Sequence, residues 1–269
     1  MIDREELSER EREAVEELLF RLADDEFVIA ERYTEWQIYA PTIESDLALA
    51  NIAQDEFGHA RLWYDCLADL GYAEAEYLWE RPSTDFRHAT LCELAFAEGD
   101  WADAVVRSYL YDTAERLRLE ALVDSSYVPI RDRVGKVIAE ESYHREHASN
   151  WLDRLASESE GRERVQNATG RLFPHALTLF EPGDHEETIV ESGFRTDSLD
   201  DLRTEWLETV VPYLESIGIE VPGPESVERP DAVGRDGSHT DDWDDLHESF
   251  TATYHELGFA EPTRLRGEP

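Results

Sequence analysis

Apolar residues recur every three to four positions along most of this chain, which is the pattern of helices that bury one face. The stripes predict helices at about 10–39, 43–71, 86–97, 101–123, 129–157, 162–180, 198–217 and 241–257. Residues 218–240 are rich in Gly, Pro and Asp and are expected to form an irregular strap. The sequence therefore predicts an all-α fold built on four long helices, with short connections that make two antiparallel hairpins.

Acidic residues interrupt these apolar stripes. Glu26, Glu56 and Glu141 each have Leu, Ile, Val or Ala neighbours three, four or seven positions away. A lone carboxylate on a buried face loses hydration free energy unless it is paired, protonated or bound to a metal. These positions are therefore candidates for metal ligands.

The two hairpins carry the same arrangement of ligand types. Each downstream glutamate is followed three residues later by histidine, which places both side chains on one helix face. One carboxylate from each of two helices and Glu-x-x-His from each of two others is the ligand set of a di-iron four-helix bundle. The predicted metal ligands are Glu26, Glu56, His59, Asp112, Glu141 and His144.

Other interpretations compete with this one. With 63 acidic residues and 9 histidines, the Glu-x-x-His spacing should occur about once by accident. A buried Glu–His pair, or a solvated acidic face, would give the same pattern. Asp112 lies on a mixed face, where Glu115 is a rival for the same role.

The charge of the chain limits its partners. Its formal net charge is −38, spread along the whole length, and Lys136 is the only lysine. Phosphate-bearing partners would be repelled, so neither nucleic acid nor a membrane is expected. In molar salt the Debye length falls to about 3 Å, which screens such self-repulsion. The composition therefore predicts a halophilic, haloarchaeal source.

Compartment and domain organisation follow from the same sequence. No apolar run is long enough to span a bilayer, and the polar N-terminus does not resemble a signal peptide. Cys66 and Cys92 lie in apolar helical contexts and are expected to be reduced, so a cytoplasmic protein is predicted. Residues 1–269 are expected to form a single domain, with a bundle core at about 10–160 and a helical extension at about 161–269.

Five stretches form a recognisable set: Arg32–Trp36 with Ala40-Pro41, Asp46–Arg61, Trp101–Asp103 with Asp112, Glu140–His144, and Gly234–Thr240. Together they resemble the phenylacetic-acid catabolic family, the ferritin-like subunits of the multicomponent phenylacetyl-CoA epoxidase. The resemblance covers roughly residues 20 to 258. It implies a ferritin-like four-helix bundle with additional C-terminal helices.

The family has a catalytic branch with a di-iron site and a structural branch whose ligand positions have mostly decayed. Asp46–Ala53 and Gly-Ser-His-Thr resemble the structural branch, whereas Gln54–His59 and Glu140–His144 resemble the catalytic branch. The resemblance places all six predicted ligands on the catalytic branch's iron ligands and favours Asp112 over Glu115. A non-catalytic structural subunit is the alternative, and a ferritin-type iron-oxidising protein is a third hypothesis.

The resemblance also implies a mechanism. Glu56 and Glu141 would bridge two iron ions, with manganese as the alternative metal. Asp55 and Glu140 each lie next to one of these glutamates and one turn before a histidine, so they are candidates to support the histidine ligands, with solvent-facing acids as the alternative. The expected substrates are dioxygen and an aromatic acyl-CoA. The expected protein partners are a second ferritin-like subunit or a second copy of this chain, and a separate flavin and iron–sulfur reductase.

Overall fold

A computed structural model describes residues 2–96, 100–224 and 226–258. In this part of the chain every regular element is helical. The α-helices are α1 Glu9–Trp36, α2 Ile43–Asp69, α3 Thr90–Glu93, α4 Trp101–Glu120, α5 Val128–Ala156, α6 Ser159–Ala176, α7 Glu186–Glu191, α8 Leu199–Ser216 and α9 Asp241–Leu257. The predicted all-α, ferritin-like bundle with additional C-terminal helices is confirmed.

Side-chain caps fix where the long helices begin. The Ser8 hydroxyl accepts from the backbone N–H of Glu11, whose carboxylate in turn accepts from the Ser8 N–H, so α1 starts with a capping box. Thr42 caps α2 and Asp100 caps α4 in the same way, through a side-chain oxygen that accepts from a first-turn N–H. These contacts satisfy backbone donors that have no intrahelical partner.

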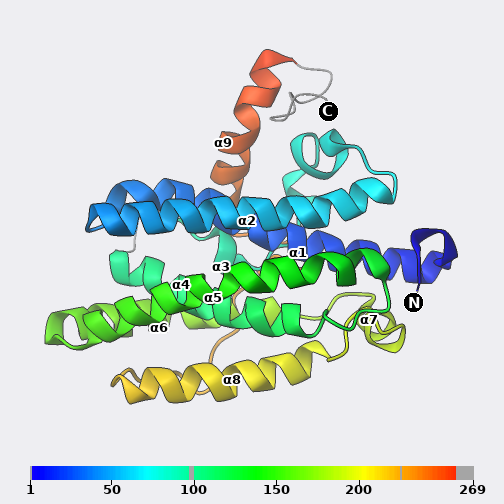
Figure 1. Cartoon of the computed structure of the whole chain (residues 1–269). Coiled ribbons are helices and arrows are strands. Elements are labelled where there is room, and N and C mark those ends of the chain that lie inside the picture. The colour runs from blue at the N-terminus through cyan, green and yellow to red at the C-terminus, as the bar shows by residue number, and fades with distance from the viewer. Residues whose placement is uncertain (1, 97–99, 225, 259–269) are drawn as a thin grey trace.

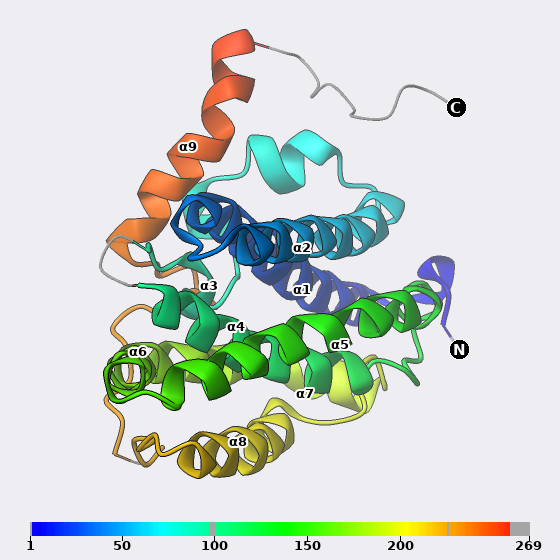
Figure 2. The same ribbon diagram turned by 60° about the vertical axis from the view of Figure 1, so that its left-hand side comes forward.

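The bundle consists of two hairpins that face each other. α1 packs along α2, and α4 packs along α5, with α2 against α5 joining the pairs (Figure 1). α6 and α8 cover the outer side of α4, and the indole of Trp206 on α8 donates to the Leu110 carbonyl of α4 at 3.0 Å. α9 projects from the opposite side of the molecule (Figure 2).

The segment before α4 differs from its prediction as one helix over 86–97. Among its described residues, 86–96, only Thr90–Glu93 is α-helical. The N–H of Arg87 donates to Asp24 Oδ2 at 2.7 Å, and the N–H of Ala89 donates to Asp25 Oδ1 at 2.8 Å. Because buried carboxylates on α1 take these donors, the segment stays extended up to α3. α7 was also not predicted, since it is a short helix within an acidic connection.

The strap at residues 218–240 is held against the bundle. Arg235 contacts Asp25 on α1 through both terminal nitrogens, at 2.7 and 3.1 Å. Gly234 has φ +71°, and a Cβ there would lie 1.9 Å from the His88 carbonyl oxygen, so a larger residue would have to displace backbone. The expectation that residues 1–269 form one domain stays a prediction.

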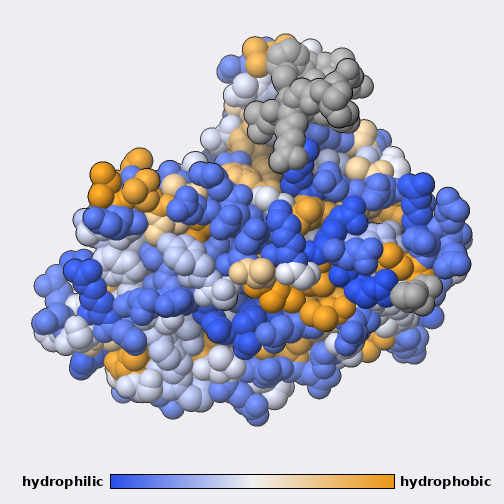
Figure 3. Space-filling model, in the orientation of Figure 1, coloured by the Kyte–Doolittle hydropathy of each residue, from blue (hydrophilic) through white to orange (hydrophobic). Residues whose placement is uncertain are grey.

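The visible surface is mostly hydrophilic, with an apolar group at the end of the α1–α2 hairpin (Figure 3). Its residues are Ile38, Tyr39, Ile43 and Leu47, each more than half exposed. Across the described ranges, no helix is both long and apolar enough to cross a membrane.

Candidate metal centre

All six predicted ligand side chains lie inside the bundle, at 0 to 2% exposure. Glu26 comes from α1, the pair Glu56 and His59 from α2, Asp112 from α4, and the pair Glu141 and His144 from α5. Their donor atoms form two groups, one of Glu26, Glu56, His59 and Glu141 and the other of Glu56, Asp112 and His144, with all atoms of a group within 4.8 Å.

Two of the glutamates lie between the histidines. Glu56 Oε2 is 3.7 Å from His59 Nδ1, and Glu56 Oε1 is 3.4 Å from His144 Nδ1. Glu141 Oε1 is 3.4 Å from each Nδ1 atom. Glu26 contacts the His59 side, with 3.7 Å between its Oε2 and Nδ1. This arrangement is suited to two cations that share Glu56 and Glu141.

Each histidine turns its other nitrogen towards an acid on the opposite hairpin. His59 Nε2 donates to Glu140 Oε2 at 2.9 Å, and His144 Nε2 donates to Asp55 Oδ2 at 3.3 Å. Such a contact fixes the tautomer and leaves Nδ1 as the lone-pair donor that faces the centre. Asp55 and Glu140 thus each contact the histidine of the other hairpin rather than the one on their own helix.

The cluster has more buried acceptors than donors to satisfy them. Both carboxylate oxygens of Glu26, Glu56 and Glu141 lack a hydrogen bond, as do Asp112 Oδ1 and the Nδ1 atoms of both histidines. Unpaired buried polar atoms are rare and costly in native proteins. Two divalent cations would provide the missing partners, so the donor set fits a two-metal site.

The pKa values report the same crowding of charge. Burial, followed by the neighbouring Glu56 carboxylate, raises the pKa of Glu26 well above its usual range. Burial and Glu141 raise the pKa of Asp112 similarly. Burial and neighbouring carboxylates both disfavour the ionised forms of Glu26 and Asp112, and a bound cation would favour them.

The rivalry between Asp112 and Glu115 has a structural explanation. Both side chains are fully buried on α4. Glu115 Oε2 accepts from two nitrogens of Arg118, whereas Asp112 Oδ2 accepts only from the Ser108 hydroxyl, at 2.8 Å. Glu115 therefore already has a cationic partner, and Asp112 keeps an oxygen free beside His144.

The sequence interpretation overlooked two buried acids next to Glu26. Asp24 accepts from Tyr64 and Arg81 at 2.8 and 2.7 Å, and Asp25 accepts from Arg118 and Arg235. The sequence did contain an indication of them, because Asp24, Asp25 and Glu26 are three consecutive acids within an otherwise apolar helix. Helical spacing alone could not show which of the three faces the centre.

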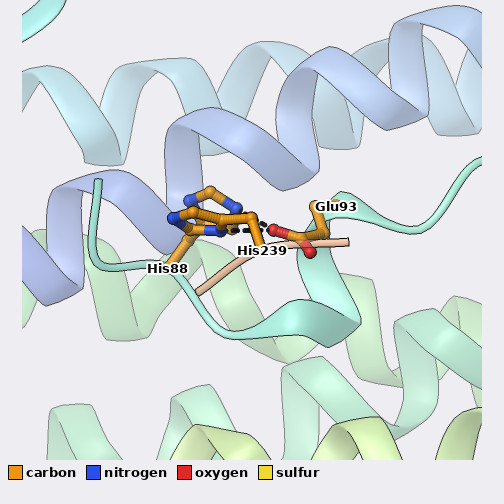
Figure 4. A group of neighbouring side chains, drawn as sticks. All are labelled: His88, Glu93 and His239. Carbon is orange, nitrogen blue, oxygen red and sulfur yellow. Dashed lines mark hydrogen bonds and ion pairs between the residues drawn. The ribbon is translucent and has the colours of Figure 1, made fainter. Parts of the chain in front are cut away.

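A third group of possible metal-binding atoms joins the strap to α3 (Figure 4). His88 Nε2 and His239 Nδ1 lie 2.5 and 2.7 Å from the same oxygen of Glu93. The two rings are stacked, with centroids 4.5 Å apart and planes at 25°. The distances and the stacking are those of two N–H groups that share a carboxylate. This group therefore holds the strap against α3.

The chain is similar to known proteins over most of its length. The family model described as "Phenylacetic acid catabolic protein" matches residues 1–259. Two different subunits of the 1,2-phenylacetyl-CoA epoxidase of Escherichia coli K12 are similar to this chain. One is 29% identical over 224 residues, covering 82% of this chain and 88% of that protein. The other is 27% identical over 195 residues, covering 71% of this chain and 62% of that protein.

Proposed function

Because the chain belongs to the phenylacetic acid catabolic protein family, we propose that it is the di-iron subunit of a ring monooxygenase of the phenylacetyl-CoA epoxidase type. The observation that carries this proposal is the buried set of four carboxylates and two histidines with unpaired atoms. Both relatives are named as subunits of one epoxidase, which supports an assembly with other chains.

In the proposed site, Glu26 and His59 would hold one ion, and Asp112 and His144 the other. Glu56 and Glu141 would hold both, while Glu140 and Asp55 fix the orientation of the histidine rings. Carboxylate and imidazole donors suit ferrous iron and also accept manganese. Two bound iron ions supply the activation of dioxygen, which no side chain of the protein can perform alone.

The surrounding residues would keep this chemistry away from water. The four helices bury Leu, Ile, Ala and aromatic side chains inside the bundle, where every proposed ligand is also buried. The proposed substrate is an aromatic acyl-CoA whose ring accepts one oxygen atom. Electrons would come from a separate flavin and iron–sulfur reductase, and the enzyme would work in the cytoplasm.

Metal analysis is the first test. Protein purified in high salt and loaded anaerobically with ferrous iron should bind about two ions per chain. Glu141→Ala should lose at least one of them while circular dichroism keeps its helical signal. Glu146→Ala, an exposed site on the same helix, is the matched control. Wild-type protein that stays free of iron and manganese after loading would refute the metal centre.

A non-catalytic structural subunit is the second candidate, because parts of the sequence resemble that branch of the family. Activity of the assembled complex separates the two. His59→Ala removes a proposed ligand from the interior and leaves the outer helix faces unchanged, so the complex should still assemble but convert no phenylacetyl-CoA. If this variant retains full oxygen-dependent turnover, the chemistry belongs to another chain.

A further inference from the structure

The strap is connected to the proposed metal centre by a continuous row of buried ion pairs. Arg235, on the strap, donates hydrogen bonds to the carboxylate of Asp25 on α1 through two nitrogens. Arg118, on α4, donates to the same carboxylate at 2.5 Å. Arg118 also donates to Glu115 through its other two nitrogens. Asp25 and Glu115 are fully buried, and both arginines are at most 5% exposed.

The far end of this row adjoins the metal centre, because Glu115 lies three residues after the proposed ligand Asp112 on α4. Glu115 is close enough to Glu26 for their charges to interact, and its second oxygen, Oε1, has no hydrogen bond. The row therefore reaches Glu26 through Glu115. We propose that Arg235 is a positioning residue, which holds Glu26 in its metal-binding place through Asp25, Arg118 and Glu115.

The alternation of charge explains why the strap matters. Positive and negative groups follow one another as Arg235, Asp25, Arg118 and Glu115, so each carboxylate has a cation on at least one side. Without Arg235, Asp25 keeps the Ala89 N–H and the Arg118 guanidinium as donors, and Arg118 is then the cation paired with two buried carboxylates. A buried charge that loses its partner is strongly unfavourable. Arg118 would shift towards Asp25, and Glu115 would turn a less compensated carboxylate towards Glu26.

Other contacts hold the strap in place for this role. Arg235 donates to the carbonyl oxygens of Arg87 and Leu179, at 2.6 and 3.3 Å, so its guanidinium is fixed from several sides. His239 and the Thr240 N–H both donate to Glu93, at 2.7 and 2.6 Å. The strap therefore presents Arg235 to α1 from a position about 210 residues away in sequence.

The inference rests on the proposed metal centre, and its test is a comparison among variants that are all loaded with cobalt(II). Arg235→Gln should weaken cobalt(II) binding about tenfold, the lower end for loss of a group that orients metal ligands. It should also alter the visible absorption of the bound cobalt. Arg235→Lys, which keeps the charge, should recover part of the affinity. Arg229→Gln is the matched control, because Arg229 is an exposed strap residue that pairs with Glu181.

A purely structural role for Arg235 would give a different result. In that case Arg235→Gln would lower the melting temperature, but affinity and spectrum would match those of Arg229→Gln, and the proposal would be overturned. The proposed row also predicts that the two positions are coupled. In a Glu115→Gln background, Arg235→Gln should change the cobalt(II) affinity much less than it does in the wild type. An equal loss in both backgrounds would also refute it. Failure of wild-type protein to bind cobalt(II) would instead refute the metal centre itself.

Discussion

His59 on α2 and Glu140 on α5 are joined across the bundle, with 2.9 Å between the imidazole Nε2 and the carboxylate Oε2. Asp55 and His144 form the reciprocal pair at 3.3 Å. Each hairpin therefore orients the histidine of the other. The proposed centre depends on the docking of the two hairpins, because neither hairpin contains both a histidine and its partner.

Glu140→Gln should weaken metal binding. The substitution keeps a hydrogen-bond acceptor but removes the charge that makes His59 a better ligand, and changes of this kind cost about 10- to 100-fold in affinity. Because the Glu140 side chain is 37% exposed, we expect the lower end of that range. Competition with a chelator measures the affinity. Glu146→Gln on the same helix should have no effect, and equal affinities would contradict the assigned contact.

Glu56→Gln should make the metal-free protein more stable but weaken its stabilisation by metal. Glu56 lies among buried carboxylates that repel one another when no cation is present. Neutralising it should raise the melting temperature of the metal-free protein. The same variant should lose most of the stabilisation that metal gives the wild type, which is about 2.7 kcal/mol when free metal exceeds the dissociation constant a hundredfold. Calorimetry with and without metal measures both, and Glu44→Gln, exposed on α2, is the control. A lower melting temperature without metal would count against this account.

His175 should contribute to acid sensitivity. Burial, and then the nearby charges of Arg171 and Arg107, lower its pKa to about 4, while Thr90 contacts its Nδ1 at 2.9 Å. The unfolded chain therefore binds more protons than the folded one between about pH 6.5 and pH 4. The contribution of His175 to the free energy of unfolding should therefore decrease as pH falls through this window. The decrease should be complete near pH 4 and amount to at most about 3 kcal/mol.

Urea unfolding at several pH values measures this contribution. His175→Gln should flatten the curve between pH 6.5 and 4, because glutamine does not titrate. The exposed His255 provides the control, since His255→Gln should leave the curve of the wild type unchanged. Identical curves for all three proteins would exclude a role for His175.

Salt should stabilise this protein strongly. Its net charge of −38 creates repulsion that molar salt screens, because the Debye length falls from about 10 Å at 0.1 M to about 3 Å at 1 M. The melting temperature should rise between these concentrations in both NaCl and KCl. Sucrose at equal osmolality separates screening from solute exclusion. A melting temperature that does not change with salt would argue against a halophilic source.

Much of the fold could be read from the spacing of apolar residues. The spacing of three to four positions between apolar residues predicted all four bundle helices, since each helix buries a continuous stripe of these residues against its neighbours. The segment 86–97 was predicted wrongly as one helix, because its N–H groups donate to Asp24 and Asp25, which lie more than sixty positions earlier. Local propensity carries no information about such distant acceptors.

The order of residues along the chain was enough to identify which of them could form the centre, because Glu-x-x-His on an apolar stripe places two ligands on one buried face. How these ligands combine depends on the packing of the helices: Glu56 and Glu141 lie between both histidines, and Glu140 contacts His59 rather than the histidine of its own helix. The same packing pairs Arg118 with Glu115 and brings Arg235 to Asp25. Helical spacing fixes the direction of a side chain around its own axis, whereas the packing of helices against one another fixes which side chains meet.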